Sequence, residues 1–304
     1  MRRALVVAVV LGCHGSAAAP AARPDAAAAD GPAPVRGLRE TDRSRGGDAI
    51  VAPARAEHFD ADRWAMRFGR FGSVKAMAVS PDGRVAIVYG ADSPSTCLCD
   101  RDRGRGGSSA GALVRLTRAS EGPPIERVLA THTSRRDYRV AASTTSVAAV
   151  EGTTLSVWPA TGDGAAVTRD LGRPAPSSLA WATDRYLVAT RDVDVDRTDV
   201  VVLDRQAAFV AVHTWPVAGT IHAIAARPGT GELAIATTRY RATDVVHVDE
   251  RRVSIHGLDG RLRARVDTRG YPASVAWSPR GDELVVSATG AGPAEQAVLR
   301  FDVE

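Results

Sequence analysis

Two distant stretches of this 304-residue chain share one pattern. Residues 73–92 read SVKAMAVSPDGRVAIVYGAD, and residues 271–290 read YPASVAWSPRGDELVVSATG. Each has an alternating apolar run, a Ser-Pro-x-Gly corner and a second apolar run, which predicts two antiparallel strands joined by a tight turn. A repeated unit of this kind restricts the chain to folds that are assembled from copies of one motif.

Three more copies of the unit, with weaker corners, cover residues 138–152, 176–191 and 221–238. A third apolar run follows every copy, and a fourth run follows all copies but the last. The third runs begin at residues 112, 154, 199, 252 and 296, and the fourth runs begin at residues 125, 165, 208 and 262. We expect residues 62–71, DRWAMRFGRF, to supply the fourth strand that the last copy lacks.

Units of four strands and roughly 40 to 60 residues predict an all-β fold, namely a β-propeller of about five four-stranded blades. We expect an N-terminal strand to pair with the C-terminal blade, because this pairing closes the ring without a long unpaired edge. A β-sandwich is the alternative that the same number of strands permits. Four tryptophans are expected to pack between blades: Trp158, Trp181, Trp215 and Trp277.

The Ser-Pro-Asp-Gly corner at residues 80–83 resembles the corners of bacterial WD40-like and TolB-like propeller repeats. The resemblance covers residues 62–304 in outline, and it implies the propeller fold. No unit carries a Gly-His or Trp-Asp signature, so the hydrogen-bonded tetrad of eukaryotic WD40 repeats is not implied.

The N-terminal residues, MRRALVVAVVLGCHGS, place Arg2 and Arg3 before a short apolar segment. This segment is too short to span a bilayer and is typical of an export signal. Residues 10–13, Val-Leu-Gly-Cys, resemble the lipobox of bacterial lipoproteins. The resemblance implies a signal peptide over residues 1–12 and a lipid on Cys13. It also implies a location in the bacterial cell envelope, at the outer membrane or cell surface rather than the inner membrane. An ordinary secretory peptide is the alternative.

Residues 13–60 are rich in Ala, Pro and Arg. We expect them to form a disordered tether, because they have too few large apolar side chains to offset the entropy lost on ordering. The propeller domain is expected over residues 61–304.

The net charge of +4 comes from arginines that are scattered along the chain, with Lys75 as the only lysine. Because these charges are not clustered, nucleic acid is not an expected partner. We expect a monomer that contacts a membrane through its lipid anchor only.

Three charged insertions, at residues 90–111, 191–198 and 238–251, are expected between second and third strands. With the blade-to-blade connection at residues 131–138, they would crowd one rim of the propeller. Loops on a rigid scaffold commonly bind partners, so we expect this rim to bind a protein or a glycan of the envelope. The candidate rim residues are Asp100, Arg101, Asp102, Arg135, Arg136, Arg239, Tyr240, Arg241 and His247.

Cys97 and Cys99 are the only cysteines besides Cys13. Because an exported protein meets an oxidising compartment, a local disulfide between them is one expectation, although a bridge between residues two apart is strained. A metal site such as zinc, with Asp100 or Asp102 as further ligands, is a second possibility. Two unpaired thiols are the third.

Asp192, Asp194 and Asp196 alternate along one insertion, as acidic ligands do at the start of a calcium-binding loop. Arg197 stands where such a loop needs its glycine, and Leu203 stands where it needs its glutamate. A solvated acidic loop is therefore favoured over a calcium site. No cofactor is expected, with calcium or zinc as the alternative.

A non-catalytic binding or scaffolding module is the favoured function, because the chain has no His-Glu-x-x-His zinc motif and no phosphate-binding glycine loop. One alternative is an envelope enzyme of the glycan hydrolase or lyase type, which needs carboxylates near the axis of the propeller. The other is a metal-responsive or redox-responsive sensor that uses the two thiols and the acidic loops.

Overall fold

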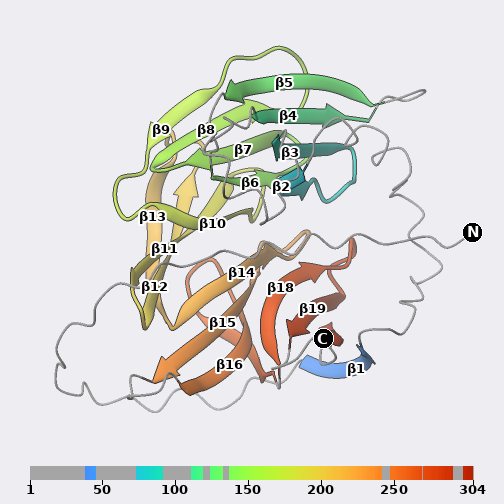
Figure 1. The fold of residues 1–304 in the computed structure, drawn as a ribbon, viewed down its shortest axis with the longest axis vertical. Helices are drawn as coiled ribbons and strands as arrows, with labels where there is room; N and C mark the ends of the chain where they lie inside the picture. The colour runs from blue at the N-terminus through green and yellow to red at the C-terminus, as the bar shows by residue number, and fades with distance from the viewer. Residues whose placement is uncertain are drawn as a thin grey trace, which may run out of the picture.

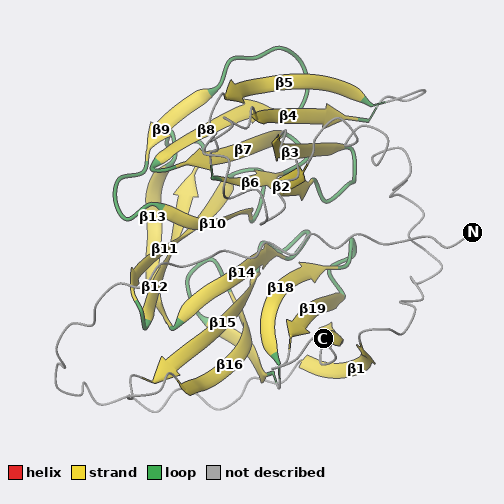
Figure 2. Cartoon of the chain, in the orientation of Figure 1, coloured by secondary structure: helices red, strands yellow, loops and turns green. Residues whose placement is uncertain are grey.

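The computed structural model describes residues 38–45, 73–91, 111–118, 124–132, 137–241, 247–268, 270–289 and 297–303. Within these ranges the elements are strands joined by turns and loops (Figure 2). No helix that is long and apolar enough to cross a membrane occurs there. The 20 strands assemble into five antiparallel sheets of four strands, which confirms the all-β prediction.

Each sheet is one blade of consecutive strands, except where the two ends of the chain meet. Blade 1 holds β2 (Ser73–Val79), β3 (Val85–Ala91), β4 (Gly111–Thr117) and β5 (Ile125–His132), and blade 2 holds β6 (Tyr138–Ala142), β7 (Ser146–Glu151), β8 (Thr154–Pro159) and β9 (Val167–Asp170). Blade 3 holds β10 (Pro176–Trp181), β11 (Tyr186–Asp194), β12 (Arg197–Asp204) and β13 (Val210–Ala218). Blade 4 holds β14 (Thr220–Ala226), β15 (Leu233–Arg241), β16 (His247–His256) and β17 (Leu262–Asp267). Blade 5 holds β18 (Tyr271–Trp277), β19 (Glu283–Thr289), β20 (Ala297–Val303) and β1 (Leu38–Arg45).

The blades are arranged radially. The first strands β2, β6, β10, β14 and β18 gather around the middle of the molecule, whereas β5, β9 and β13 lie at its periphery (Figure 1). Neighbouring blades contact each other through these first strands, β2 with β6, β6 with β10, β10 with β14 and β14 with β18. This arrangement is a five-bladed β-propeller, as the repeats predicted.

An N-terminal strand completes the last blade, as expected, but it is not the predicted one. β1 (Leu38–Arg45) pairs antiparallel with β20, from Leu38 opposite Val303 to Arg45 opposite Ala297. Residues 62–71, which were expected to form this strand, lie outside the described residues. The prediction of a tether over residues 13–60 is therefore wrong for residues 38–45. The sequence of β1, LRETDRSR, is mostly polar and carries little of the apolar signal by which strands are predicted.

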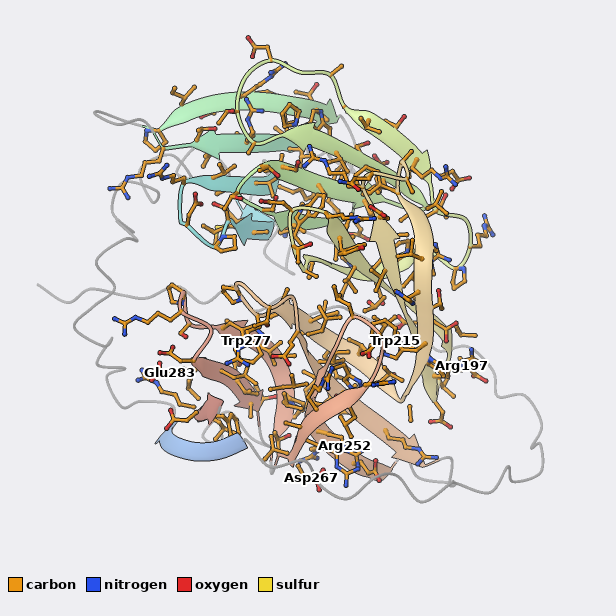
Figure 3. All side chains as sticks on the ribbon, turned by 180° about the vertical axis from the view of Figure 1, so that it is seen from behind. Arg197, Trp215, Arg252, Asp267, Trp277 and Glu283 are labelled. Carbon is orange, nitrogen blue, oxygen red and sulfur yellow. The ribbon has the colours of Figure 1, made fainter. Side chains whose placement is uncertain are left out.

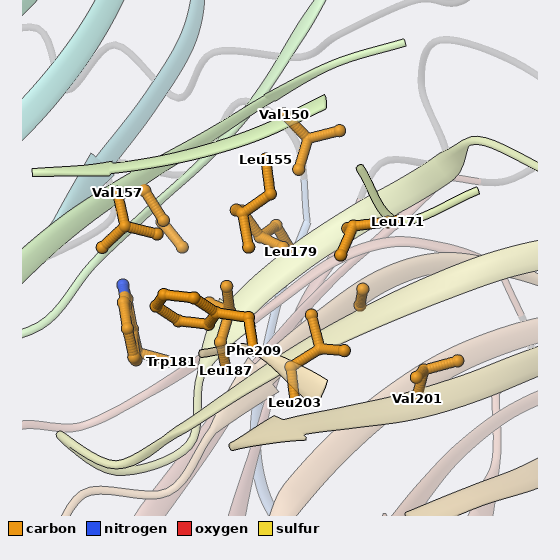
Figure 4. Close-up of a cluster of buried hydrophobic side chains, with 13 residues drawn as sticks. Val150, Leu155, Val157, Leu171, Leu179, Trp181, Leu187, Val201, Leu203 and Phe209 are labelled. Carbon is orange, nitrogen blue, oxygen red and sulfur yellow. The ribbon is translucent and has the colours of Figure 1, made fainter. Parts of the chain in front are cut away.

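The hydrophobic core consists of separate clusters, most of which lie between neighbouring blades. The cluster between blades 2 and 3 includes Leu155, Leu187 and Leu203, and in it Trp181 meets Phe209 edge-on at 6.2 Å between ring centroids (Figure 4). Second and third strands supply most of this core, because both faces of these strands are covered. The other three tryptophans of the prediction, Trp158, Trp215 and Trp277, are partly buried against neighbouring clusters. This confirms that these four tryptophans are packing residues.

The serines of the Ser-Pro-x-Gly corners of blades 1 and 5 make similar hydrogen bonds, although the aspartate partner stands two residues after the serine in blade 1 and four residues after it in blade 5. In blade 1 the Ser80 hydroxyl donates to Asp82 at 2.6 Å and accepts from the Val85 amide at 2.9 Å. In blade 5 the Ser278 hydroxyl donates to Asp282 at 2.6 Å and accepts from the Glu283 amide at 3.1 Å. In both corners the serine hydroxyl therefore accepts a hydrogen bond from the first amide of the strand that follows the turn, which explains why serine stands at this position of the repeat.

Candidate binding site at the rim end of the propeller

The two ends of the propeller carry different connections. The corners between first and second strands open on one end, and the connections between second and third strands and between blades open on the other. We call the second one the rim end. The sequence-predicted rim residues in the first insertion, Cys97, Cys99, Asp100, Arg101 and Asp102, lie outside the described residues. Arg135, Arg136 and the proposed lipid attachment site, Cys13, do so as well.

The acidic insertion of blade 3 is a hairpin rather than the predicted loop. β11 continues to Asp194 and β12 begins at Arg197, so that only Val195 and Asp196 form the turn. The alternation of Asp and Val in DVDVD is itself a strand pattern, which the prediction of a loop overlooked. Val193 and Val195 are 48% and 71% exposed. Arg197, which forms an ion pair with Asp199 at 2.9 Å, lies at the edge of the molecule in Figure 3.

The insertion of blade 4 is also an extension of two strands. β15 runs to Arg241 and β16 begins at His247, with Arg239 opposite Glu250 and Arg241 opposite His247. Four predicted rim residues, Arg239, Tyr240, Arg241 and His247, therefore share one hairpin at the rim end. The Arg239 side chain is exposed.

The three aspartates that resembled the start of a calcium loop make separate local contacts. The Asp192 carboxylate accepts hydrogen bonds from the hydroxyls of Ser177 at 3.2 Å and Thr198 at 3.1 Å. Asp194 accepts from the amide of Val195 at 2.7 Å, and the backbone carbonyl of Asp196 accepts from the amide of Gly219 at 2.7 Å. Among the described residues no group of three or more metal-ligating side chains converges. A calcium site here stays a prediction.

Four of the five first strands carry a β-bulge at the same position. The register shifts at Lys75 in β2, Ser177 in β10, His222 in β14 and Ala273 in β18. Each of these residues stands five positions before the corner residue of its blade: Ser80, Ala182, Arg227 and Ser278. In blade 2, which has no bulge in β6, the matching residue is Tyr138. A bulge leaves a residue unpaired in the ladder and redirects its side chain, which is why bulges are frequent at functional sites.

We call these five equivalent residues, together with their neighbours Arg139 and Tyr271, the inner ring. All of them stand near the start of a first strand, and the first strands start at the rim end. The inner ring therefore lies on the first strands of the five blades, at the end where the extended hairpins emerge. Its members come from all five blades and, apart from Ala273, have polar or charged side chains.

Hydrogen bonds hold one side of the inner ring. In blade 4 the Nε2 atom of His222 is 2.7 Å from the hydroxyl of Thr238, and its Nδ1 atom is 2.8 Å from the hydroxyl of Tyr271 in blade 5. The imidazole and the phenol ring also pack together, with 4.4 Å between centroids. In blade 3 the Ser177 hydroxyl is 2.9 Å from that of Thr190. These contacts fix His222, Tyr271 and Ser177 in place.

The two cations of the inner ring have unused donors. Lys75 is partly exposed, and its ammonium group makes no hydrogen bond or ion pair to any residue within the described ranges. Arg139 is exposed, and its Nε donates to the backbone carbonyl of Ser177 at 2.7 Å. Its two terminal nitrogens have no partner in that part of the chain. The five first strands, as the structure bounds them, contain no Asp or Glu.

Sequence reasoning missed the inner ring, although part of the signal was visible. Aligning the five copies on their corners places Lys75, Tyr138, Ser177, His222 and Ala273 in one column. The bulges are not visible in the sequence. A further motif also escaped notice: residues 107–111, Gly-Ser-Ser-Ala-Gly, have the spacing of a nucleophile elbow. Such an elbow leads from a strand into a helix, whereas Gly111 begins strand β4, so the motif is out of context.

The fold and the inner ring define the class of protein: a five-bladed β-propeller whose first strands carry a largely polar set of residues, four of them at bulges, near the rim end. Comparison with known families found no family model that matches the chain. No curated protein matches its sequence either. The function is therefore inferred from the residues and their arrangement.

Proposed function

We propose that this chain is a non-catalytic binding module of the bacterial cell envelope, anchored by a lipid on Cys13, which binds a protein or glycan partner at the rim end of its propeller. The proposed relationship to WD40-like and TolB-like repeats is supported by the Ser-Pro-Asp-Gly corner. The proposed anchor is supported by the lipobox-like residues 10–13.

The observation that carries the binding proposal is the inner ring. Four bulges interrupt the first strands at equivalent positions near one end of the molecule, the end where the hairpins of blades 3 and 4 extend. A glycan hydrolase would need a pair of carboxylates near the axis. No first strand carries an acidic residue, and the carboxylates of Glu151 and Asp192, which contact the inner ring, accept hydrogen bonds from the hydroxyls of Tyr138 and Ser177. We therefore favour binding over that alternative.

The lipid anchor is tested by expressing the full chain in a bacterium that processes lipoproteins. The mass of the N-terminal peptide should show a mature chain that begins at acylated Cys13 and sediments with membranes. The Cys13→Ser variant should lose the acyl groups and leave the membrane fraction, whereas Cys97→Ser, as the matched control, should keep both properties. A mature N-terminus elsewhere, or membrane attachment of Cys13→Ser, would contradict the proposal.

The binding end is tested by photo-crosslinking in cells. A photoreactive amino acid replaces Arg239 at the rim end or, as the control, Arg84 at the opposite end of blade 1, where the side chain is 77% exposed. Adducts with a protein partner should form from position 239 and not from position 84. Equal adducts from both positions would contradict a rim-specific partner.

A further inference from the structure

We propose that the face of blade 1 that is turned toward blade 5 is a docking surface for residues 62–71 of the same chain, DRWAMRFGRF. We call this face, formed by Ala86, Val88, Val114 and Leu116, the blade 1 face. Residues 62–71 lie outside the described residues, and the outer-strand position that the sequence suggested for them is occupied by β1.

The blade 1 face is defined by the regular alternation of side chains on β3 and β4. These two strands pair without a register shift, so successive side chains point to opposite faces of the sheet. Ile87 and Leu113 pack in the cluster shared with blade 2. Ala86 and Val88 therefore point away from blade 2, toward the side on which blade 5 follows in the radial arrangement (Figure 1).

The blade 1 face is buried, although no described blade covers it. Its four residues are each at most 2% exposed. The other four core clusters of the described residues each combine two neighbouring blades, whereas this cluster contains residues of blade 1 only. Among the described strands, those of blade 5 make at most isolated contacts with those of blade 1. The atoms that bury this face therefore belong to chain outside the described ranges.

The path of the chain favours residues 46–72 as the cover. They connect β1, the outer strand of blade 5, with β2, the first strand of blade 1, so their two ends are fixed on the two blades that flank this face. Neighbouring strands lie about 4.8 Å apart, so the face extends about 10 Å from β2 to β4. An extended chain spans about 3.3 Å per residue, so the five residues before Ser73 are enough to cross it.

Within this connection, residues 62–71 have the side chains that fit the face. Trp64, Met66 and Phe68 alternate with arginine and alanine, which is the pattern of a strand with one large apolar side. The blade 1 face consists of alanine, valine and one leucine, so larger side chains can pack on it and bury a large apolar area. Gly69 and Gly72 allow the chain to turn back over blade 1 before β2 begins.

The other long stretches outside the described ranges fit less well. Residues 92–110, between β3 and β4, consist mainly of glycine, serine and charged residues, with Leu98 as the one large aliphatic side chain. Residues 4–11 are apolar but belong to the predicted export signal. Neither stretch joins blade 5 to blade 1, so we assign the blade 1 face to residues 62–71.

Two buried positions on opposite faces of β3 provide a matched test. The full chain, with its three cysteines replaced by serine, carries either Val88→Cys on the blade 1 face or Ile87→Cys on the side of blade 2. Both side chains are fully buried, so either thiol should react slowly with a thiol reagent. The labelling rate of each thiol is then measured again after Trp64→Ser and Phe68→Ser are introduced together.

Loss of the two aromatic side chains should uncover one thiol and not the other. The labelling rate at position 88 should rise about 10-fold or more, whereas the rate at position 87 should change less than about 2-fold, because only the blade 1 face loses apolar cover. An unchanged rate at position 88 would overturn the proposal, since another part of the chain or a second copy would then cover the face. Equal increases at both positions, in a chain that keeps its β-sheet circular dichroism spectrum, would overturn it as well.

A second measurement decides the case in which the double substitution prevents folding. Photoreactive benzoylphenylalanine replaces Phe68 in the full chain carrying Cys13→Ser, and the adducts within the chain are mapped by mass spectrometry. They should fall in β3 or β4, which carry the blade 1 face; β2 is not counted, because it is close to position 68 in sequence. Adducts confined to other parts of the chain, or to a second molecule, would overturn the proposal.

Discussion

The middle strands and the first strands of the blades differ in both composition and regularity. The second and third strands, such as β3, β8 and β11, contribute apolar side chains that are almost fully buried, among them Ile87, Leu155 and Leu187. The first strands are interrupted by bulges in four blades and carry the inner ring. The difference teaches that stability and recognition are supplied by different strands of the same blade.

The largest expected effect comes from truncating a middle strand. Leu155 is fully buried in the cluster between blades 2 and 3, so Leu155→Ala should lower the free energy of unfolding by about 3 kcal/mol, through lost burial and the cavity that remains. Val167→Ala on the outer strand β9, where the side chain is 53% exposed, should change it by less than about 0.5 kcal/mol. Chemical denaturation of both variants measures the difference, and similar losses would contradict the assignment of stability to the middle strands.

A backbone substitution at the entrance to a first strand ranks second. Gly219 is the single residue between β13 and β14, with φ of +92°, and a Cβ atom there would lie 2.3 Å from the Thr238 carbonyl oxygen. Gly219→Ala should cost about 2 kcal/mol or more, from strain and the clash together. Gly162→Ala, at φ of +73° with open space around it, should cost only about 1 kcal/mol. If both variants lose the same free energy of unfolding in chemical denaturation, the close approach of the Thr238 carbonyl to Gly219 does not contribute to the cost.

The third-largest effect is expected from Arg115, which joins blades 1 and 2. Arg115 on β4 is almost fully buried and donates to the carbonyls of Pro159 at 2.6 Å and Gly162 at 2.7 Å. Burial lowers the pKa of this guanidinium, and the neighbouring Arg127 lowers it further. Arg115→Met should cost about 2 kcal/mol, because the carbonyls of Pro159 and Gly162 lose a charged donor. Arg84→Met, which replaces a solvent-exposed arginine of the same blade, is the matched control. An unchanged unfolding midpoint for Arg115→Met would contradict this role.

A smaller effect depends on pH. Burial lowers the pKa of His256 below its usual 6.5, while Ser254 and Gly260 hydrogen-bond the neutral ring. The unfolded chain therefore takes up this proton at a higher pH than the folded chain does, so the stability from His256 is present above pH 6.5 and is lost as the pH falls. The slope should not exceed about 1.4 kcal/mol per pH unit for one proton. His256→Gln should flatten the loss between pH 7 and 5, whereas His213→Gln on the exposed face of β13 should not; a slope that His256→Gln leaves unchanged would count against the assignment.

Much of the fold was predictable from the sequence because alternation and corner chemistry are local signals. The third and fourth strands of four blades were placed from apolar runs, and Ser80 and Ser278 marked the corners. β1 was missed because an outer strand needs no continuous apolar face, as the exposed strand β9, Val-Thr-Arg-Asp, also shows. The hairpin that contains Asp192 was predicted as a loop, because its run of acidic residues suggested a solvated loop and the alternation of Asp and Val was not taken as a strand pattern.

The candidate site was less predictable than the fold. The rim position of the Arg239 hairpin followed from counting strands. The inner ring did not, because a bulge is a property of strand pairing and leaves no residue signature of its own. His222 is an example. Its partners Thr238 and Tyr271 come from another strand and another blade, so no local sequence pattern predicts these contacts.

The separation of stability from recognition is tested by comparing the free energies of unfolding of the unsubstituted chain, Lys75→Gln and Leu155→Ala in one chemical denaturation experiment. The value for Lys75→Gln should agree with that of the unsubstituted chain within about 0.5 kcal/mol, because Lys75 belongs to none of the core clusters of the described residues. The value for Leu155→Ala should be lower by about 3 kcal/mol. A Lys75→Gln variant that is as unstable as Leu155→Ala would contradict the division between middle strands and inner ring.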